Sequence, residues 1–229
     1  MNLTSTFLTI KLGGWVMAPL LLIAFMAIFI VIDKIIFYYK DCKINREIIE
    51  IIEKYNFNWK SLKTHLDQIQ NKNIYKQFLN AIIDNSLQLA NLTNATKNQQ
   101  QNNSETPIWW LESRAVDEAK NIEKKLSSSL WLLETIITIA PLIGLFGTII
   151  GMMDSFKIIG DNSEIINPNG ITAGVAQSLI ATAGGLIIAI FSLIAFNFFS
   201  RKQALIIEDF ERLGTKIIDH IKLDSHHQQ

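Results

Sequence analysis

The chain has 229 residues, a formal net charge of zero, 49% apolar side chains and 18% charged side chains. Soluble domains usually carry about 25% charged residues, so this composition is typical of a membrane protein with a soluble part. A zero net charge gives no basis for binding nucleic acid, and the single cysteine, Cys42, excludes an intrachain disulfide.

The first apolar run covers residues 13–32, after an N-terminal segment of residues 1–12. The run has no charged residue and is about 20 residues long, which is enough to cross a hydrocarbon layer of about 30 Å. Lys11 is the only basic residue before it, and no small-x-small cleavage site precedes Asp33. The run is therefore predicted to be a retained first transmembrane helix and not a cleaved signal peptide.

Residues 33–106 form a polar region that we expect to be cytoplasmic and helical. Apolar residues recur at helical spacing in residues 45–55 and again in residues 72–89, with charged residues on the opposite faces. Such amphipathic helices need a partner surface. Residues 91–103 are mostly Asn, Gln and Thr with hardly any large apolar group, so they are predicted to form a flexible linker.

A further helix is predicted to begin near Pro107, because proline is tolerated in the first turn of a helix. No glycine or proline lies between Glu112 and Ser129. Residues 107–133 should therefore form a cytoplasmic extension that continues without a break into a second transmembrane helix at residues 134–156.

The third apolar run, residues 171–200, follows a loop at residues 157–170 and precedes a C-terminal helix and tail at residues 201–229. Apolar residues recur at helical spacing in this tail, so the extensions of spans two and three should pack together. Of the 21 Lys and Arg residues, 19 lie between spans one and two or after span three. The positive-inside rule places these regions in the cytoplasm and the loop in the periplasm. The predicted fold is an all-α integral membrane protein with three transmembrane helices, the N-terminus outside and the C-terminus inside, and with spans two and three extended into the cytoplasm as long helices.

A stripe of small and hydroxyl-bearing residues runs along the third span. Its members recur at spacings of 4, 3, 4 and 3, which places them on one helix face: Ser178, Thr182, Gly185, Ala189 and Ser192. A second stripe runs along the second span: Thr138, Pro141, Leu145, Thr148, Met152 and Ser155. Three glycines on a neighbouring face permit close helix approach: Gly144, Gly147 and Gly151. Helix packing alone would explain either stripe, whereas two stripes on consecutive spans favour a polar path.

These two spans resemble the signatures of a known family. The segment APLIGLFGTIIGMMDSF at residues 140–156 resembles the second-span signature of the ExbB/TolQ/MotA proton-channel family. Residues 170–186, which contain ATAGGL, resemble its third-span signature, and the position of Asn197 also matches. MotA-type stators have four spans and this chain has three, so the chain looks most like ExbB or TolQ.

The resemblance implies a homopentamer in the bacterial inner membrane that is embedded in the lipid bilayer and encloses two spanning helices of an ExbD- or TolR-like one-span partner. It also implies that proton flow drives a motion that is passed to a TonB- or TolA-like protein. The two threonines of the family map onto Thr148 and Thr182. Gln177 stands where ExbB proteins commonly carry a glutamate, and Phe191 stands where many members have a proline, which predicts a straighter third helix.

The chemistry of a proton path limits which residues can carry the proton. Such a path needs a titrating group, usually Asp, Glu or His, and glutamine cannot serve. Glu134 and Asp154 lie only at the edges of the second span. We therefore expect an intramembrane aspartate of the partner to be the carrier. The residues predicted to line its route are Thr148, Thr182, Gln177 and Ser178. The residues predicted to serve helix packing are Gly144, Gly147, Gly151 and Gly185.

Two other functions compete with an ExbB-like role. One is that of a TolQ-like subunit of the Tol-Pal envelope-maintenance system. The other is that of a non-conducting membrane scaffold, in which Gln177 marks the lost channel. Enzymatic activity is not expected, because the sequence has no phosphate-binding loop, nucleophile elbow or metal-ligand spacing. For the same reason we expect no cofactor and no metal site.

Overall fold

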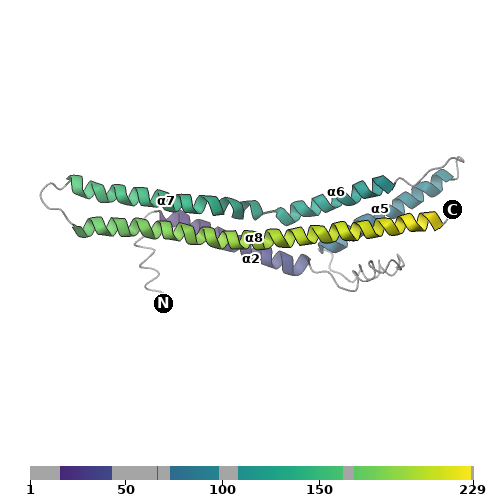
Figure 1. Ribbon diagram of the computed structural model, residues 1–229, viewed down its shortest axis with the longest axis horizontal. Coiled ribbons are helices and arrows are strands. Elements are labelled where there is room, and N and C mark those ends of the chain that lie inside the picture. Colours follow the sequence, from purple (N-terminus) through teal and green to yellow (C-terminus); the bar gives the residue numbers. More distant parts are fainter. Residues whose placement is uncertain (1–15, 43–65, 67–72, 98–107, 162–167, 228–229) are drawn as a thin grey trace. The chain divides into compact units, whose positions relative to one another are not determined.

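Figure 1 shows the computed structural model of the chain, which describes residues 16–42, 66, 73–97, 108–161 and 168–227. The helices in these ranges are α2 (Met17–Asp41), α5 (Ile74–Lys97), α6 (Ile108–Ser127), α7 (Leu130–Asp161) and α8 (Pro168–His227). The same ranges contain no β-strand, and three of their helical stretches are long and apolar enough to cross a membrane. The predicted all-α fold with three membrane-spanning helices is confirmed, while the orientation of the termini stays a prediction.

The chain divides into two compact units. The membrane unit comprises the described part of residues 1–33 and 129–200, and the extramembrane unit comprises that of residues 34–128 and 201–229. Helix α7 lies wholly in the first unit and helices α5 and α6 lie in the second, whereas α2 and α8 contribute residues to both. The division follows hydropathy, because its boundaries fall where the uncharged runs of α2 and α8 end.

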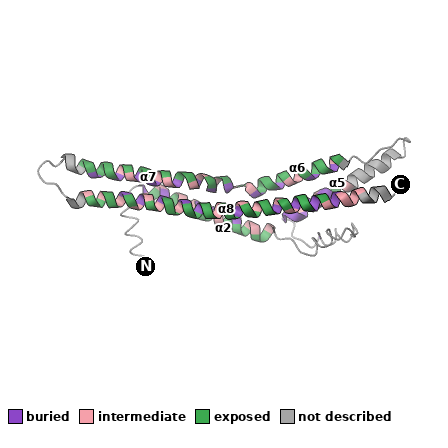
Figure 2. Ribbon diagram, viewed as in Figure 1, coloured by how far each residue is buried: buried purple, intermediate pink, exposed green. Residues whose placement is uncertain are grey.

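In the membrane unit, most large apolar side chains lie on the outside. Phe25 is 73% exposed and Ile187 is 68% exposed, and Figure 2 shows exposed residues along much of α7 and α8. Such a surface is unfavourable in water and suits hydrocarbon or other apolar helices. A small buried cluster joins the start of α2 to α8 through Val16, Leu20 and Ala181.

The extramembrane unit has a larger apolar core, which is built by the amphipathic faces of its helices. Phe78 of α5 stacks on Phe210 of α8 with ring centroids 4.6 Å apart, and Tyr75 meets the same ring edge-on at 5.0 Å. Fully buried neighbours complete the core: Leu66, Leu79, Ile82, Leu111, Ile122, Leu126 and Ile217. The periodic patterns of residues 72–89 and of the C-terminal tail therefore provide partner surfaces for each other.

The helix that we expected to run unbroken from residue 107 into the second span is interrupted. Helix α6 ends at Ser127, and Ser129 adopts a positive φ of 68° before α7 begins. Three consecutive serines occupy this joint. The hydroxyls of Ser127 and Ser128 donate to backbone carbonyls three residues earlier, at 3.2 and 2.6 Å. Such local bonds compete with regular helix, and a left-handed residue commonly ends a helix.

Three further boundaries differ from the predicted ones. Helix α5 extends to Lys97, so residues 91–97 of the predicted linker are helical. An existing helix gains one backbone hydrogen bond for each residue that it adds, and this favours its continuation into a polar segment. Helices α7 and α8 likewise occupy both ends of the predicted loop at residues 157–170. The predicted amphipathic segment at residues 45–55 and the remainder of the linker, residues 98–103, lie outside the described residues.

Helix α8 is a single helix of 60 residues that contains the third span and its extension. It has no internal proline, and Phe191 lies within it without a break. In contrast, α7 contains Pro141 within its second-span sequence. A proline removes one backbone hydrogen bond, and in a membrane bundle neighbouring groups can satisfy the freed carbonyl.

Candidate functional site

The candidate site lies in the membrane unit, where α7 and α8 approach each other at backbone distance. A Cβ atom placed on Gly144 would lie 3.0 Å from both the Ala181 carbonyl oxygen and the Thr182 Cα. A Cβ atom on Gly147 would lie 2.9 Å from the Ala181 Cβ, and one on Gly151 would lie 2.8 Å from the Ser178 Cβ. These positions tolerate no side chain, so the glycines of α7 set the distance between the two helices.

Helix α8 contributes two glycines of its own to this contact. A Cβ atom on Gly185 would lie 2.5 Å from the Ala140 carbonyl oxygen. A Cβ atom on Gly174 would collide with the hydroxyl of Ser155, which is 3% exposed. Sequence reasoning did not single out Gly174, although it continues the stripe of the third span by one more step of four residues.

The most informative polar contact of the site joins the two spans directly. The Thr182 hydroxyl donates a 3.0 Å hydrogen bond to the Gly144 carbonyl oxygen of α7. In an α-helix the carbonyl of residue i points towards the amide of residue i+4. The hydroxyl of Thr182 therefore lies beside the backbone of Thr148, and the structure brings these two candidate residues to the same level of α7.

Thr148 itself makes a bond within its own helix. Its hydroxyl donates to the Leu145 carbonyl oxygen at 2.6 Å, and its side chain is half-buried. Leu145 and Met152, from the same predicted stripe, are 54% and 44% exposed. The glycine face of α7 meets α8, whereas the part of this stripe that contains Leu145 and Met152 forms an exposed face. The last member of the stripe, Ser155, is buried. Thr148 lies where these two faces of α7 adjoin.

The remaining predicted residues lie along α8 on either side of Thr182. Ser178 is 3% exposed and donates to the Val175 carbonyl oxygen at 2.7 Å, while Gln177 is half-buried one position earlier. Ser192 is fully buried, and its hydroxyl is without a hydrogen-bond partner among the described residues. The stripe predicted from the sequence is therefore the inward face of α8.

Charged groups of the membrane unit lie at the edges of its apolar runs. Glu134 and Asp154 are both exposed, and Asp154 pairs with Lys157 at 3.4 Å across one turn of α7. Within the part of the chain that the structure describes, no cluster of His, Cys, Asp and Glu could hold a metal ion. The described residues of the site therefore offer hydroxyls and backbone carbonyls, which form hydrogen bonds but do not titrate near neutral pH.

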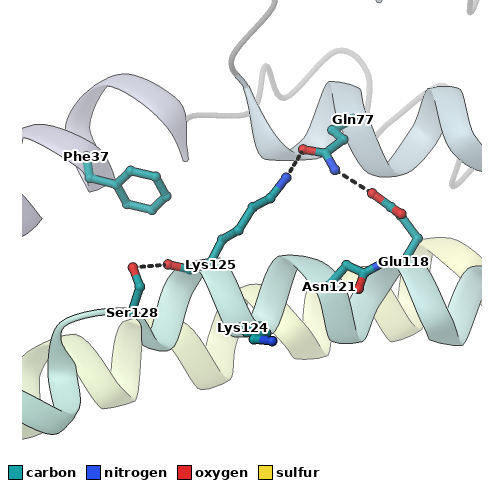
Figure 3. Close-up of a pocket in the computed structure, with 7 residues that line it drawn as sticks. All are labelled: Phe37, Gln77, Glu118, Asn121, Lys124, Lys125 and Ser128. Carbon is teal, nitrogen blue, oxygen red and sulfur yellow. Dashed lines mark hydrogen bonds between the residues drawn. The ribbon is translucent and has the colours of Figure 1, made fainter.

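The extramembrane unit contains a separate polar pocket of about 610 Å³. Figure 3 shows its lining: Phe37, Gln77, Glu118, Asn121, Lys124, Lys125 and Ser128. The Gln77 amide of α5 donates to the Glu118 carboxylate and accepts a 2.9 Å hydrogen bond from the Lys125 ammonium. This network attaches α5 to α6 beside the joint that precedes α7.

Comparison with known proteins places the sequence among membrane proton-channel components. Residues 70–212 match the family described as the MotA/TolQ/ExbB proton channel family. This range includes α7, the third span and the packed helices of the extramembrane unit. The candidate site described above lies inside the match.

Individual relatives carry the names of two related systems. Over 92 residues, the chain is 41% identical to the biopolymer transport protein ExbB of Aquifex aeolicus, covering 40% of this chain and 62% of that protein. Over 190 residues, it is 29% identical to the protein named ExbB-like 3 of Synechocystis sp., covering 82% and 81% of the two chains. It is 40% identical over 85 residues to the Tol-Pal system protein TolQ of Pseudomonas aeruginosa, covering 37% and 36%. The matched segments thus span less than two thirds of the Aquifex and Pseudomonas proteins.

Proposed function

This chain belongs to the MotA/TolQ/ExbB proton channel family, and we propose from that premise that it is the channel subunit of an ExbB-ExbD-TonB-like energy-transducing motor. In this role it lies in the bacterial inner membrane with its N-terminus outside, and it couples the proton gradient to transport across the outer membrane. The support for an ExbB role is the ExbB name of several relatives and the presence of three membrane-spanning helices.

The observation that carries this proposal is the pairing of two threonine hydroxyls with backbone carbonyls. Thr182 donates to Gly144 and Thr148 donates to Leu145. A hydroxyl has one proton and two lone pairs, and a carbonyl only accepts. Both threonine protons are therefore directed at the backbone, and both oxygens keep lone pairs that can accept from another group.

Two hydroxyl acceptors at one level of the membrane suit a protonated carboxyl group. A protonated aspartate on a partner's spanning helix can donate to such an oxygen, whereas an ionised one gains no hydrogen bond from it in this arrangement. Hydrogen bonding to the neutral form and removal from water both raise the pKa of a carboxyl group. The threonines thus favour the proton-loaded form of the carrier, with Gln177 and Ser178 beside them along α8.

The outward faces of the membrane unit support an assembly with other chains. Leu145 and Met152, which flank Thr148 on the second-span stripe, form a face that is exposed. We infer that this face meets neighbouring copies of the chain and the one-span partner, in a homopentamer that encloses two partner helices. A TonB- or TolA-like protein would then receive the motion.

Purification of the full chain in mild detergent, together with a one-span protein that has an intramembrane aspartate, tests this assembly. We expect co-purification and a native mass that corresponds to five copies of this chain. The double variant Thr148→Val with Thr182→Val should assemble equally well, because it removes only two hydroxyls. A monomer that retains no small partner would contradict the proposal.

One observation favours a second candidate, the non-conducting scaffold. Gln177 is neutral at a position where the family resemblance leads us to expect a glutamate. A scaffold would form the same assembly but would pass no protons even in its native form. Restoration of the carboxylate by Gln177→Glu would then be needed before any proton flux appears, whereas the channel proposal expects flux from the native chain.

A further inference from the structure

Lys34 is a buried charged residue that the proposed proton path does not use. It follows the uncharged part of α2, where a lysine ordinarily extends its ammonium group towards water. Here the residue is only 2% exposed and belongs to the extramembrane unit. Burial of an ammonium group costs free energy unless the group is paired or hydrogen-bonded. The groups that Lys34 contacts therefore indicate its structural role.

The Lys34 ammonium group donates a 2.8 Å hydrogen bond to the Leu126 carbonyl oxygen. It also lies 5.5 Å from the ring centroid of Phe37, one turn further along α2. Leu126 is in the last turn of α6, where carbonyls lack intrahelical partners and the helix dipole favours a positive charge. Lys34 therefore caps the C-terminus of a helix that lies 92 residues away in the sequence.

The capped carbonyl is one that a continuous helix would use. In an unbroken helix, the Leu126 carbonyl would accept the amide of Leu130, the first residue of α7. The ammonium group of Lys34 lies against that oxygen instead. Three residues after Leu126, Ser129 has a φ of 68°, and the Leu132 amide donates to the Ser129 carbonyl at 3.2 Å to start α7.

The sequence of this joint is compatible with a second arrangement. Serine is an acceptable helix residue, whereas a left-handed backbone is unfavourable for any residue except glycine. The hydroxyl bonds of Ser127 and Ser128 compete with regular helix, but residues 127–129 contain no glycine or proline, so a left-handed Ser129 remains locally unfavourable. A long-range contact can supply the difference.

We propose that Lys34 is a positioning residue that holds the α6–α7 joint in its interrupted form. Without the ammonium group, the Leu126 carbonyl becomes available to the chain and the joint converts to continuous helix. Each residue added to a helix turns the following part by about 100°, so this conversion changes the rotation of α7 and of the face that carries Thr148. The inference about rotation rests on the proposed function, whereas the inference about the joint does not.

The backbone of Ser129 reports directly on the joint. In the full-length protein with ¹³C-labelled serine, the Cα and Cβ chemical shifts of Ser129 distinguish left-handed from helical backbone, and Ser129→Ala identifies the signal. We expect the left-handed signal to fall by at least half in Lys34→Met and to remain in Lys34→Arg. The matched control is Lys40→Met, which removes an exposed lysine of the same helix and should leave the signal unchanged.

A second substitution keeps the test decisive if cells accumulate too little of the Lys34→Met protein. Ser129→Gly removes the cost of the left-handed backbone and disfavours helix. The double variant Lys34→Met with Ser129→Gly should therefore restore the interrupted joint. It should also restore the amount of protein that the cell accumulates and the gradient-dependent work of the assembly. Failure of this rescue, or an unchanged Ser129 signal in Lys34→Met, would overturn the role of Lys34.

The two proposals fail in distinguishable ways. If the native chain drives no gradient-dependent work, the proposed function is wrong, and the Ser129 signal still decides whether Lys34 holds the joint. If the native chain drives such work and Lys34→Met shifts the Ser129 signal without any loss of work, Lys34 does not position the proton path.

Discussion

The Thr182 hydroxyl and the Gly144 carbonyl oxygen lie 3.0 Å apart and join the third span to the second. The same two residues are in backbone contact, since a Cβ atom on Gly144 would lie 3.0 Å from the Thr182 Cα. Close packing and the candidate polar path therefore depend on one contact. The two explanations of the paired stripes, helix packing and a proton path, are compatible at this point of the structure.

Removal of the Thr182 hydroxyl should weaken the α7–α8 contact. Thr182→Val keeps the shape of the side chain but loses the hydrogen bond, and we expect a loss of about 1 kcal/mol of stability. Thr182→Ser keeps the hydroxyl and should lie nearer the native value. Thermal unfolding of the purified protein in detergent compares the two, and a valine variant more stable than the serine variant would contradict this role.

Neighbouring glycines of the third span should differ sharply in their tolerance of a methyl group. Gly185→Ala places a Cβ atom 2.5 Å from the Ala140 carbonyl oxygen, which must force the helices apart. Overpacking of this kind costs about 1–3 kcal/mol. Gly184→Ala is the matched control, because no atom from another helix among the described residues lies within 4 Å of its Cβ position. Equal apparent melting temperatures for the two variants would show that this contact does not limit stability.

The sequence is sufficient to predict the elements whose apolar pattern is strong and local. The three spans, the inward stripe of α8 and the amphipathic faces around Phe78 and Phe210 all follow from periodicity. These predicted features agree with the structure because the burial of a side chain depends on its spacing along one helix. Pro141 also indicates where α7 loses a regular backbone hydrogen bond, and the glycines of α7 indicate where another helix packs closely against it.

The joint between α6 and α7 could not be predicted in the same way. Its cause is a contact between Lys34 and Leu126, which are 92 residues apart in the sequence. Nothing in the local pattern around Ser129 indicates a left-handed backbone, because glycine is the usual marker. Similarly, the second-span stripe gave no sign that Leu145 would face outward while Gly144 met α8, since both faces have the same period.

The extramembrane core should depend on a hydrogen bond between α5 and α8. The Tyr75 hydroxyl donates to the Asp209 carboxylate at 3.0 Å, and Arg212 pairs with the other carboxylate oxygen at 3.3 Å. We expect Tyr75→Phe to cost about 1.5–2 kcal/mol, the lower part of the range for bonds to charged groups, because Asp209 keeps its arginine. Tyr39→Phe, at a tyrosine that is 82% exposed, is the control and should have no effect in the same denaturation experiment.

The stability contributed by Tyr75 should also be lost in alkali. Burial, with the charge of Asp209 as a smaller cause, raises the pKa of Tyr75 above its ordinary value of 10.0. A raised pKa in the folded state stabilises the fold fully below pH 10 and less as the pH rises towards the raised value. Phenolate absorbance from Tyr75 should therefore appear only with unfolding, and its appearance at pH 10 in the folded protein would contradict this account of its burial.

Cys42 should react slowly with alkylating reagents in the folded protein. Burial, followed by the charge of Asp41 and partly offset by Lys34, raises the pKa of its thiol from 9.0 to about 12. The thiolate is the reactive form, so alkylation at pH 8 should be slower in the folded than in the unfolded chain by a factor on the order of a thousand, the ratio of their thiolate fractions. The neutral thiol adds stability below pH 9 that is lost as the pH rises towards 12. Equal alkylation rates in the folded and unfolded chains would contradict this.

Proton flux into liposomes tests most directly whether Thr148 and Thr182 line a proton path. The native chain would be reconstituted with its one-span partner, a pH gradient imposed, and the internal pH followed with an enclosed dye. We predict rapid flux for the native assembly and for Thr135→Val, which removes a hydroxyl that likewise donates to its own helix, at 2.8 Å. Thr148→Val with Thr182→Val should lower the flux to that of liposomes without the partner. Native flux in this double variant would contradict the proposed path.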